Sequence, residues 1–314
     1  MIPKKPRILV VSSANMDFIQ HTDRAPYPGE TVMGTSYDYL PGGKGANSAI
    51  ALTFLGAECI FCARVGADSN GQRLRTIFRE AGIDSRFIFM ERKAPTGLAS
   101  VIVDNKTGQN QIIVFPGANS YLSPVDVEEA FTSLPDCVLL QFEIPDKAVI
   151  AATEYAAEKG IPVIIDAGPA RADYPLNKLY PCEIFSPNET ELETYTGIAP
   201  KNTESCLRAA IRLASMVEAK YYVIKMGSRG VFYYDGKYYN IIPAHDVDVV
   251  DTTAAGDIFT AALAAEYMRT GDIMRAVRYA NIAGAISVTR AGALNSVPTE
   301  RDIAEFIENR GIKL

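Results

Sequence analysis

Short apolar runs rich in β-branched residues alternate with segments of helical spacing along most of this chain of 314 residues. The apolar runs are Ile8–Val11, Cys59–Val65, Val138–Phe142, Val163–Asp166 and Tyr222–Lys225. The helical segments are Ala46–Leu55, Asn70–Ala81, Val125–Phe131, Asp146–Glu158 and Thr203–Glu218. Strands and helices in this alternation form a parallel sheet that is covered on both faces. The sequence therefore predicts an α/β fold of three layers, α/β/α, with a mostly parallel central sheet.

Some stretches with strand-like period two have no helices between them. They are Gly29–Leu40, Thr96–Asp104 and Gln111–Phe115. We expect a small β-sheet, contributed by about residues 18–40 and 96–115, that projects from a single domain spanning residues 1–314. Its inward face is expected to carry Val32, Tyr37, Leu98 and Val101. Such a sheet could act as a lid that excludes water from a reactive site.

The charge balance argues against a nucleic-acid partner. Lys and Arg number 31 against 37 Asp and Glu, which gives a net charge of −6, and no dense basic run is present. Met1–Arg7 is basic, but polar residues from Ser12 to Asp17 interrupt the apolar run that follows. We therefore expect neither a signal peptide nor a membrane span.

Cysteine usage predicts a cytoplasmic protein. The five cysteines are scattered through a long chain, as is typical of reduced thiols. Cys59 and Cys62 form a C-x-x-C within an apolar run, but no second pair completes a zinc site. We interpret both as buried strand residues. A metalloenzyme is disfavoured as well, because His21 and His245 are the only histidines.

The segment Val250–Asp257 is the strongest chemical signal in the sequence. Its small residues lead directly into the helical Ile258–Arg269. Small residues at a helix start let the free N–H groups approach an anion, and the helix dipole favours negative charge there. Asp257 could be an ordinary helix cap. It could also be a general base beside an anion hole formed by Ala254, Ala255, Gly256 and Asp257, which is what transfer of a phosphoryl group to a hydroxyl requires.

A glycine-rich turn, Pro41–Asn47, precedes the first helical segment. It matches neither a P-loop nor the G-x-G-x-x-G fingerprint, so a nicotinamide dehydrogenase is disfavoured. Its glycines allow close backbone approach, and Lys44 and Asn47 could donate to sugar hydroxyls. Asn15 and Asp17 alternate at the expected end of the first strand, where they could bind vicinal hydroxyls. Each motif could also be an ordinary turn.

Two further motifs have the same ambiguity. Ser186–Glu191 contains acidic residues that suit the first turn of a helix. Lys225–Gly230 leaves a strand and is either a turn or a loop that cradles a nucleotide phosphate.

Together these motifs resemble the PfkB-type carbohydrate kinases, and most of all their ribokinase-like members. The shared order is Asn-x-Asp at 15–17, Gly-Gly-Lys-Gly-x-Asn at 42–47, Glu143, Pro-Asn-Glu-x-Glu at 187–191, Gly-Ser-Arg-Gly at 227–230 and Asp-Thr-x-Ala-Ala-Gly-Asp at 251–257. The resemblance runs from about residue 8 to about residue 308 and includes Pro28–Val32 and Val288–Gly292. It implies a ribokinase-like fold and an ATP-dependent kinase that phosphorylates the primary 5-hydroxyl of a pentose.

The resemblance also implies roles for individual residues. Those expected to bind the sugar are Asn15, Asp17, Gly42, Gly43, Lys44, Asn47 and Glu143, with Asp257 as the base. Those expected to contact ATP are Asn188, Lys225, Gly227, Ser228, Gly230, Gly256 and Asn281. Glu191 would place Mg²⁺ through water. A potassium ion would lie near Asp251, Thr253, Ser287, Arg290, Gly292 and Ser296, several of them acting through backbone carbonyls. A homodimer formed through the lid is implied as well.

Two departures from the family pattern leave the sugar open. Lys225 stands where ribokinase-like members commonly have Thr, and Asp166–Pro169 replaces Asn-Pro-Ala-Pro. We expect the Lys225 side chain to touch an ATP phosphate, so that Lys225→Thr raises the KM for ATP. D-ribose, giving ribose 5-phosphate, is the first expectation and 2-deoxyribose or another sugar the second. The alternatives are a nucleoside kinase, which needs an apolar base pocket, and a sugar-binding protein that has lost its base.

Overall fold

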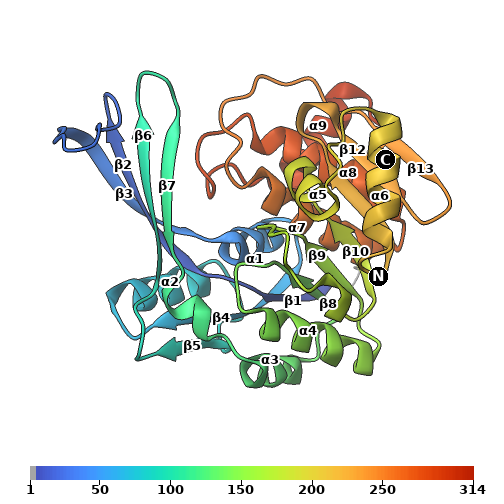
Figure 1. The fold of residues 1–314 in the computed structure, drawn as a ribbon, viewed down its shortest axis with the longest axis horizontal. Coiled ribbons are helices and arrows are strands. Elements are labelled where there is room, and N and C mark those ends of the chain that lie inside the picture. The colour runs from blue at the N-terminus through green and yellow to red at the C-terminus, as the bar shows by residue number, and fades with distance from the viewer. Residues whose placement is uncertain (1–4) are drawn as a thin grey trace.

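The computed structural model describes residues 5–314 and is built on a nine-stranded sheet (Figure 1). Residues 1–4, where the basic N-terminal segment begins, lie outside the described part. The strands, in spatial order, are β13 (Tyr239–Ile242), β12 (Val231–Tyr234), β11 (Ala219–Lys225), β10 (Cys182–Ser186), β9 (Val163–Asp166), β8 (Cys137–Leu140), β1 (Arg7–Val11), β4 (Glu58–Gly66) and β5 (Ile88–Glu91). All neighbours are parallel except at the edge, where β12 pairs antiparallel with both β11 and β13. The predicted mostly parallel sheet is confirmed.

Helices cover both faces of this sheet, as the alternation predicted (Figure 1). One face carries α1 (Lys44–Phe54), α2 (Ser69–Glu80), α7 (Ala255–Thr270), α8 (Ile273–Ser287) and α9 (Glu300–Arg310). The other carries α3 (Pro124–Ala130), α4 (Asp146–Lys159), α5 (Glu189–Thr196) and α6 (Thr203–Ala214). Successive strand residues point to opposite cores, so that Leu139 packs in one and Leu140 in the other. Burial on both faces explains why these strands are continuously apolar.

A separate four-stranded sheet, which we call the lid sheet, projects away from the main body (Figure 1). Its order is β3 (Gly34–Gly42), β2 (Asn15–Thr22), β6 (Gly97–Asp104) and β7 (Asn110–Phe115). The strand expected over 29–40 begins only at Gly34, because the preceding segment contains Pro28 and Gly29, whose φ of 81° suits a turn.

Two expectations about the lid sheet are corrected. Asn15 and Asp17 do not end the first strand: they begin β2, which pairs with β3 and β6. The four residues expected on one inward face do not share it. Leu98 pairs with Met16 and Val101 with Ile19, and these neighbours alternate across the sheet; Val32 lies outside the strands.

The cysteines are structural, as predicted. All five are buried and unpaired, and Cys59 and Cys62 pack into opposite cores, so they cannot bind one ion together. Over residues 5–314, the structure contains no helix with the length and apolar character needed to cross a bilayer.

Candidate active site

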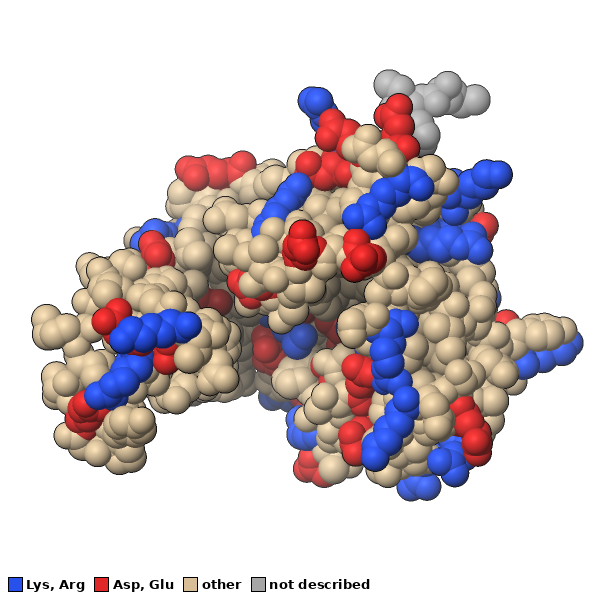
Figure 2. Space-filling view, turned by 90° about the horizontal axis from the view of Figure 1, so that it is seen from above, with Lys and Arg blue, Asp and Glu red and all other residues tan. Residues whose placement is uncertain are grey.

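The predicted site residues gather where the parallel strands end. The strands β1, β8, β9, β10 and β11 run in one direction, so their carboxyl ends form one edge of the sheet. Ligands of open α/β sheets bind outside this edge. Seen from above, the surface is hollowed between the lid sheet and the main body, and charged side chains are visible in the hollow (Figure 2).

Asp257 lies in the first turn of α7 with its carboxylate buried. Oδ1 accepts a hydrogen bond from Lys44 Nζ at 3.1 Å, and Oδ2 accepts one from Asn47 Nδ2 at 2.8 Å. Gly43 precedes α1 with a φ of 84°, a conformation that glycine supplies and that brings Lys44 to this place. Burial raises the pKa of Asp257 to about 6, although the Lys44 ammonium opposes the shift. Such a carboxylate is ionised at neutral pH yet basic enough to accept a proton.

Backbone donors lie beside this carboxylate at the start of α7. The N–H groups in the first turn of a helix have no partner within the helix. The N–H of Ala255 donates to the Thr252 carbonyl at 3.2 Å, which leaves those of Gly256 and Asp257 for an anion. Ala254 turns the chain into the helix with a φ of 60°, a strained conformation of the kind that clusters at functional sites.

Lys44 contacts acidic residues of α7, of β9 and of the loop that follows β8. Its Nζ lies 3.1 Å from Asp257 and 3.7 Å from Asp166, and its backbone N–H donates to Glu143 Oε2 at 3.1 Å. Ser13 Oγ donates to the same Glu143 oxygen at 2.5 Å. Burial opposes the charged form, but Asp257 and Asp166 outweigh it and raise the pKa of Lys44. The ammonium is therefore a permanent charge at this site.

Asp17, on β2 of the lid sheet, lies near the Glu143 carboxylate. Its Oδ1 is buried and has no hydrogen-bond partner among residues 5–314. Burial raises the pKa of Asp17 to about 7, and the Glu143 carboxylate adds to the shift. A Cβ on Gly42 would lie 2.1 Å from Asp17 Oδ2, so a larger residue there would displace the Asp17 carboxylate. Asn15, on the same face of β2, accepts from Asn119 Nδ2 at 2.7 Å.

A cavity of about 680 Å³ adjoins this cluster. Its size is in the range of small-molecule sites. All seven residues predicted to contact a nucleotide line it: Asn188, Lys225, Gly227, Ser228, Gly230, Gly256 and Asn281. Lys44 and Glu191 line it too, so the cavity and the Asp257 cluster share a wall.

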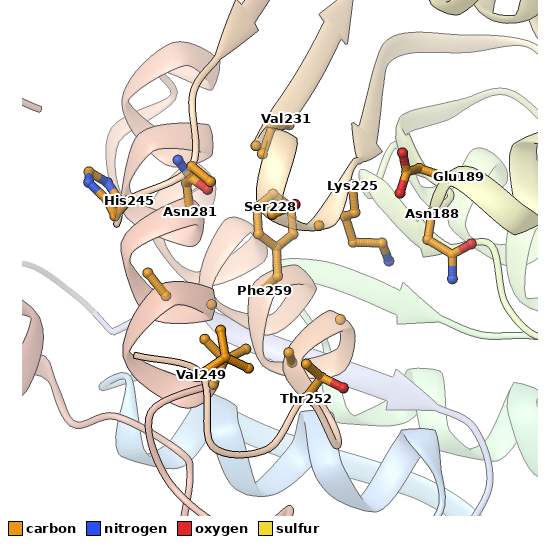
Figure 3. Close-up of a pocket in the computed structure, with 18 of the residues that line it drawn as sticks. Asn188, Glu189, Lys225, Ser228, Val231, His245, Val249, Thr252, Phe259 and Asn281 are labelled. Atoms are coloured by element: carbon orange, nitrogen blue, oxygen red, sulfur yellow. The ribbon is translucent and has the colours of Figure 1, made fainter. Parts of the chain in front are cut away.

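Polar side chains lie at both ends of the cavity. His245 and Asn281 lie at one end, Lys225 and Asn188 at the other, and Phe259 between them (Figure 3). Apolar residues also line the cavity: Val231, Val249, Ala285 and Val288. These apolar residues were not predicted to line the site, because nothing in their sequence pattern distinguishes them from core residues.

Glu191 is held at the cavity wall by a capping box of α5. Its N–H donates to Asn188 Oδ1 at 2.8 Å, and the Asn188 N–H donates to Glu191 Oε2 at 2.7 Å. Within residues 5–314, no three His, Cys, Asp or Glu side chains are grouped to hold a metal ion. A Mg²⁺ ion here would need phosphate oxygens and water as its remaining ligands, which is its usual preference.

The two departures from the family pattern contact each other. Lys225 was expected to face a phosphate, and although it lines the cavity, its Nζ forms an ion pair with Asp166. Asp166 is fully buried. Burial works against its charged form, but Lys225 and Lys44 outweigh it and lower the pKa of Asp166.

Hydrogen bonds join three of the residues expected around potassium. Asp251 Oδ1 accepts from the Thr253 N–H at 2.9 Å and its hydroxyl at 2.6 Å, and Oδ2 accepts from the Gly292 N–H at 2.8 Å. The Arg290 guanidinium pairs instead with Asp302 at 3.2 Å, so only its carbonyl could serve a cation. The remaining two, Ser287 and Ser296, are buried.

Two polar residues that belong to none of the sequence motifs, Gln141 and Asn119, form hydrogen bonds around the site. Gln141 Nε2 donates to the Lys44 carbonyl at 3.1 Å and to Ser48 Oγ at 2.9 Å, while its Oε1 accepts from Ser12 Oγ at 2.6 Å. Asn119 Oδ1 accepts from the Ala14 N–H at 2.9 Å. A polar residue that interrupts the apolar run Val138–Phe142 was the available signal for Gln141.

A buried carboxylate, helix N–H groups beside it without a partner among residues 5–314, and an adjoining cavity together fit one class of protein, an α/β kinase that phosphorylates a small hydroxylated substrate. Comparison with known proteins identifies the family. The pfkB family carbohydrate kinase model matches residues 5–300, and the chain belongs to this family. It is therefore a carbohydrate kinase, a phosphotransferase with an alcohol group as acceptor.

Individual relatives and structures match over nearly the whole chain. The ribokinase of Haemophilus influenzae is 36% identical, over 96% of this chain and 98% of its own length. The deoxyribokinase of Salmonella typhi is 32% identical, over 96% of this chain and 98% of its own length. The structure of Arabidopsis thaliana ribokinase complexed with ribose and ATP has a TM-score of 0.86 at 30% identity, covering 97% of this chain and 99% of that one.

Proposed function

We propose that this protein transfers the γ-phosphoryl group of ATP to the 5-hydroxyl of D-ribose, giving ribose 5-phosphate and ADP. The observation that carries the proposal is the buried carboxylate of Asp257, which lies beside the free N–H groups of α7 and a cavity of nucleotide size. The ribokinase relatives support ribose and ATP as the substrates. We further propose that residues 1–314 form one kinase domain with the lid sheet as its cover, and that it acts in the cytoplasm, which the buried, unpaired cysteines support.

In the proposed reaction Asp257 accepts the proton of the sugar hydroxyl as its oxygen attacks the γ-phosphorus. The bond to the bridging oxygen of ATP breaks, and ADP leaves with the electron pair. The N–H groups of Gly256 and Asp257 stabilise the charge on the transferred group, because positioning and electrostatics dominate phosphoryl transfer. Asn15, Asp17 and Glu143 supply acceptors for the sugar hydroxyls. Mg²⁺, held by the phosphates and by Glu191 through water, would neutralise phosphate charge.

A second substrate, 2-deoxyribose, is favoured by the similarity to the Salmonella deoxyribokinase. A panel of free pentoses, hexoses and nucleosides, assayed with ATP for ADP release, tests both. We expect the highest kcat/KM with D-ribose. A clear preference for 2-deoxyribose or for a nucleoside would replace the proposed substrate, and no turnover of any sugar would contradict the proposed function.

We also propose that potassium activates the enzyme through the loop held by Asp251. Potassium should raise activity several-fold over choline at equal ionic strength, and Asp251→Ala should abolish that response, since its carboxylate joins Thr253 to Gly292. The measurement is the initial rate with saturating ATP and sugar. Equal wild-type rates in potassium and choline would contradict this role.

We propose that the lid sheet forms a homodimer interface. Ile112 and Val114 of β7 are 54% and 51% exposed, and they lie on the face that carries Asp17. Exposed apolar surface of this kind marks interaction sites. The double variant Ile112→Asp, Val114→Asp should sediment as a monomer at micromolar concentration, whereas Ile113→Asp, on the opposite face, should remain dimeric. A wild-type monomer would refute the proposal.

A further inference from the structure

Lys225 and Asp166 form a buried ion pair at the carboxyl edge of the sheet. Asp166 is the last residue of β9 and Lys225 the last of β11, so the lysine side chain reaches across the end of β10 between them. The Asp166 side chain has no exposed area, and that of Lys225 is 12% exposed. The small exposed part of Lys225 belongs to the cavity wall, as Figure 3 shows.

Asp166 also faces a second ammonium. Its Oδ2 has no hydrogen bond among residues 5–314, but lies 3.7 Å from Lys44 Nζ. Lys44 Nζ in turn lies 3.1 Å from Asp257. From the cavity to the base, the charged side chains therefore follow the order Lys225, Asp166, Lys44, Asp257. Asp166 lies between the two lysines and contacts both.

The Lys225 ammonium lies at the start of α7. Its Nζ is 3.4 Å from Thr260 Oγ1 and 3.8 Å from where a Cβ on Gly256 would be. Gly256 immediately precedes the base, and its N–H is one of the donors left free for an anion. A phosphoryl group that bridges the cavity and Asp257 must pass this point.

A contribution to folding stability does not explain why the Lys225–Asp166 ion pair is buried here. Taking two charges out of water costs about as much as their attraction returns, and neutral partners of similar volume are often as stable. A charge fixed in place before the reaction is valuable where charge develops in the transition state.

Resting on the kinase function proposed above, we propose that Lys225 contacts the transferred γ-phosphoryl group and that Asp166 is the positioning residue that holds Lys225 and Lys44 in place for it. The inference adds a side-chain cation to the backbone donors of α7. It also predicts a contact that distinguishes the triphosphate from the diphosphate.

The test uses the full-length protein as wild type, Asp166→Asn, Lys225→Thr and the double variant. Affinities for ADP and for a non-hydrolysable ATP analogue are measured by calorimetry, together with kcat and the unfolding midpoint. Lys225→Thr should weaken analogue binding at least about tenfold with ADP binding little changed, and should lower kcat about 10²-fold, as for loss of one transition-state donor. Asp166→Asn should lower kcat, because Lys225 is no longer held in position for the reaction. It should not weaken binding of the ATP analogue, because the freed Lys225 ammonium can still contact the γ-phosphate.

The double variant separates catalysis from folding. Each single variant leaves one buried charge without its closest partner and should unfold at lower temperature, whereas the double variant should regain the wild-type midpoint but not the wild-type kcat. Lys220→Thr is the matched control, since it breaks an ion pair to Glu183 on the same strand β11 at its other end, and it should leave kcat and both affinities unchanged.

Two results would overturn the inference. Recovery of wild-type kcat in the double variant would show that the pair only supports the fold. Equal loss of ADP and analogue affinity in Lys225→Thr would show that the lysine does not contact the γ-phosphate. The affinities need no sugar turnover, so they test the inference even if the wild type phosphorylates none of the sugars and the proposed function fails.

Discussion

Replacing Asp257 with asparagine is expected to lower kcat by at least about 10²-fold while sugar and ATP still bind, since general bases contribute about 10² to 10⁴. Asparagine has the shape of aspartate and can still bond Lys44 or Asn47, so the site should keep its geometry. Its amide cannot accept the proton of the sugar hydroxyl. Steady-state kinetics and calorimetric titration of each substrate measure the two effects.

The pH dependence gives this substitution a specific signature. Burial raises the pKa of Asp17 to about 7 and that of Asp257 to about 6. A raised carboxyl pKa means that the group is protonated below that pH: Asp17 then loses acceptor capacity, and Asp257 can no longer act as a base. Wild-type kcat/KM for the sugar should therefore fall about tenfold per pH unit below about 7 and more steeply below about 6.

In Asp257→Asn, kcat/KM should keep the tenfold fall per pH unit below about pH 7 but should lack the steeper fall below about pH 6. Ser48→Ala is a suitable control, because Ser48 Oγ donates to the Asp257 carbonyl and not to its carboxylate. It should leave the wild-type pH profile in place. A wild-type kcat in Asp257→Asn would remove Asp257 from the reaction and with it the proposed mechanism.

The architecture could be predicted because it depends on patterns that repeat along the chain. Buried parallel strands need apolar residues on both faces, and runs such as Val163–Asp166 are confirmed as strands. The motifs before α1 and α7 could be found because glycine and small residues there leave room for close neighbours. Gly42 is an example, since a Cβ at that position would clash with the Asp17 carboxylate. Each of these signals is contained within a few neighbouring residues.

What could not be predicted depends on partners distant in sequence. Asn15 and Asp17 look like a turn because their segment is polar, and only pairing with β3 and β6 makes it a strand. Gln141 and Asn119 belong to no motif, and their value lies in hydrogen bonds to residues more than 90 positions away. The orientation of Lys225 likewise depends on Asp166, 59 residues earlier.

Replacing Asp17 with alanine is expected to raise the KM for the sugar by at least about 10²-fold, while the affinity for ATP stays the same. A hydrogen bond to a charged group is worth about 1.5 to 3 kcal/mol. If the Asp17 carboxylate accepts hydrogen bonds from two sugar hydroxyls, the alanine variant loses both. The buried, unpartnered Oδ1 of Asp17 shows that the protein itself does not use this acceptor capacity. Asp38→Ala, an exposed carboxylate on neighbouring strand β3, is the matched control and should not change the KM.

Stability provides the second half of this test. A buried carboxylate without a partner costs the folded protein free energy, so Asp17→Ala should unfold at the same temperature as the wild type or a higher one. A variant that loses sugar affinity and stability together would indicate that Asp17 supports the lid sheet. An unchanged KM would show that the sugar does not contact Asp17, and the face of the lid sheet that carries it would no longer be the sugar-binding face.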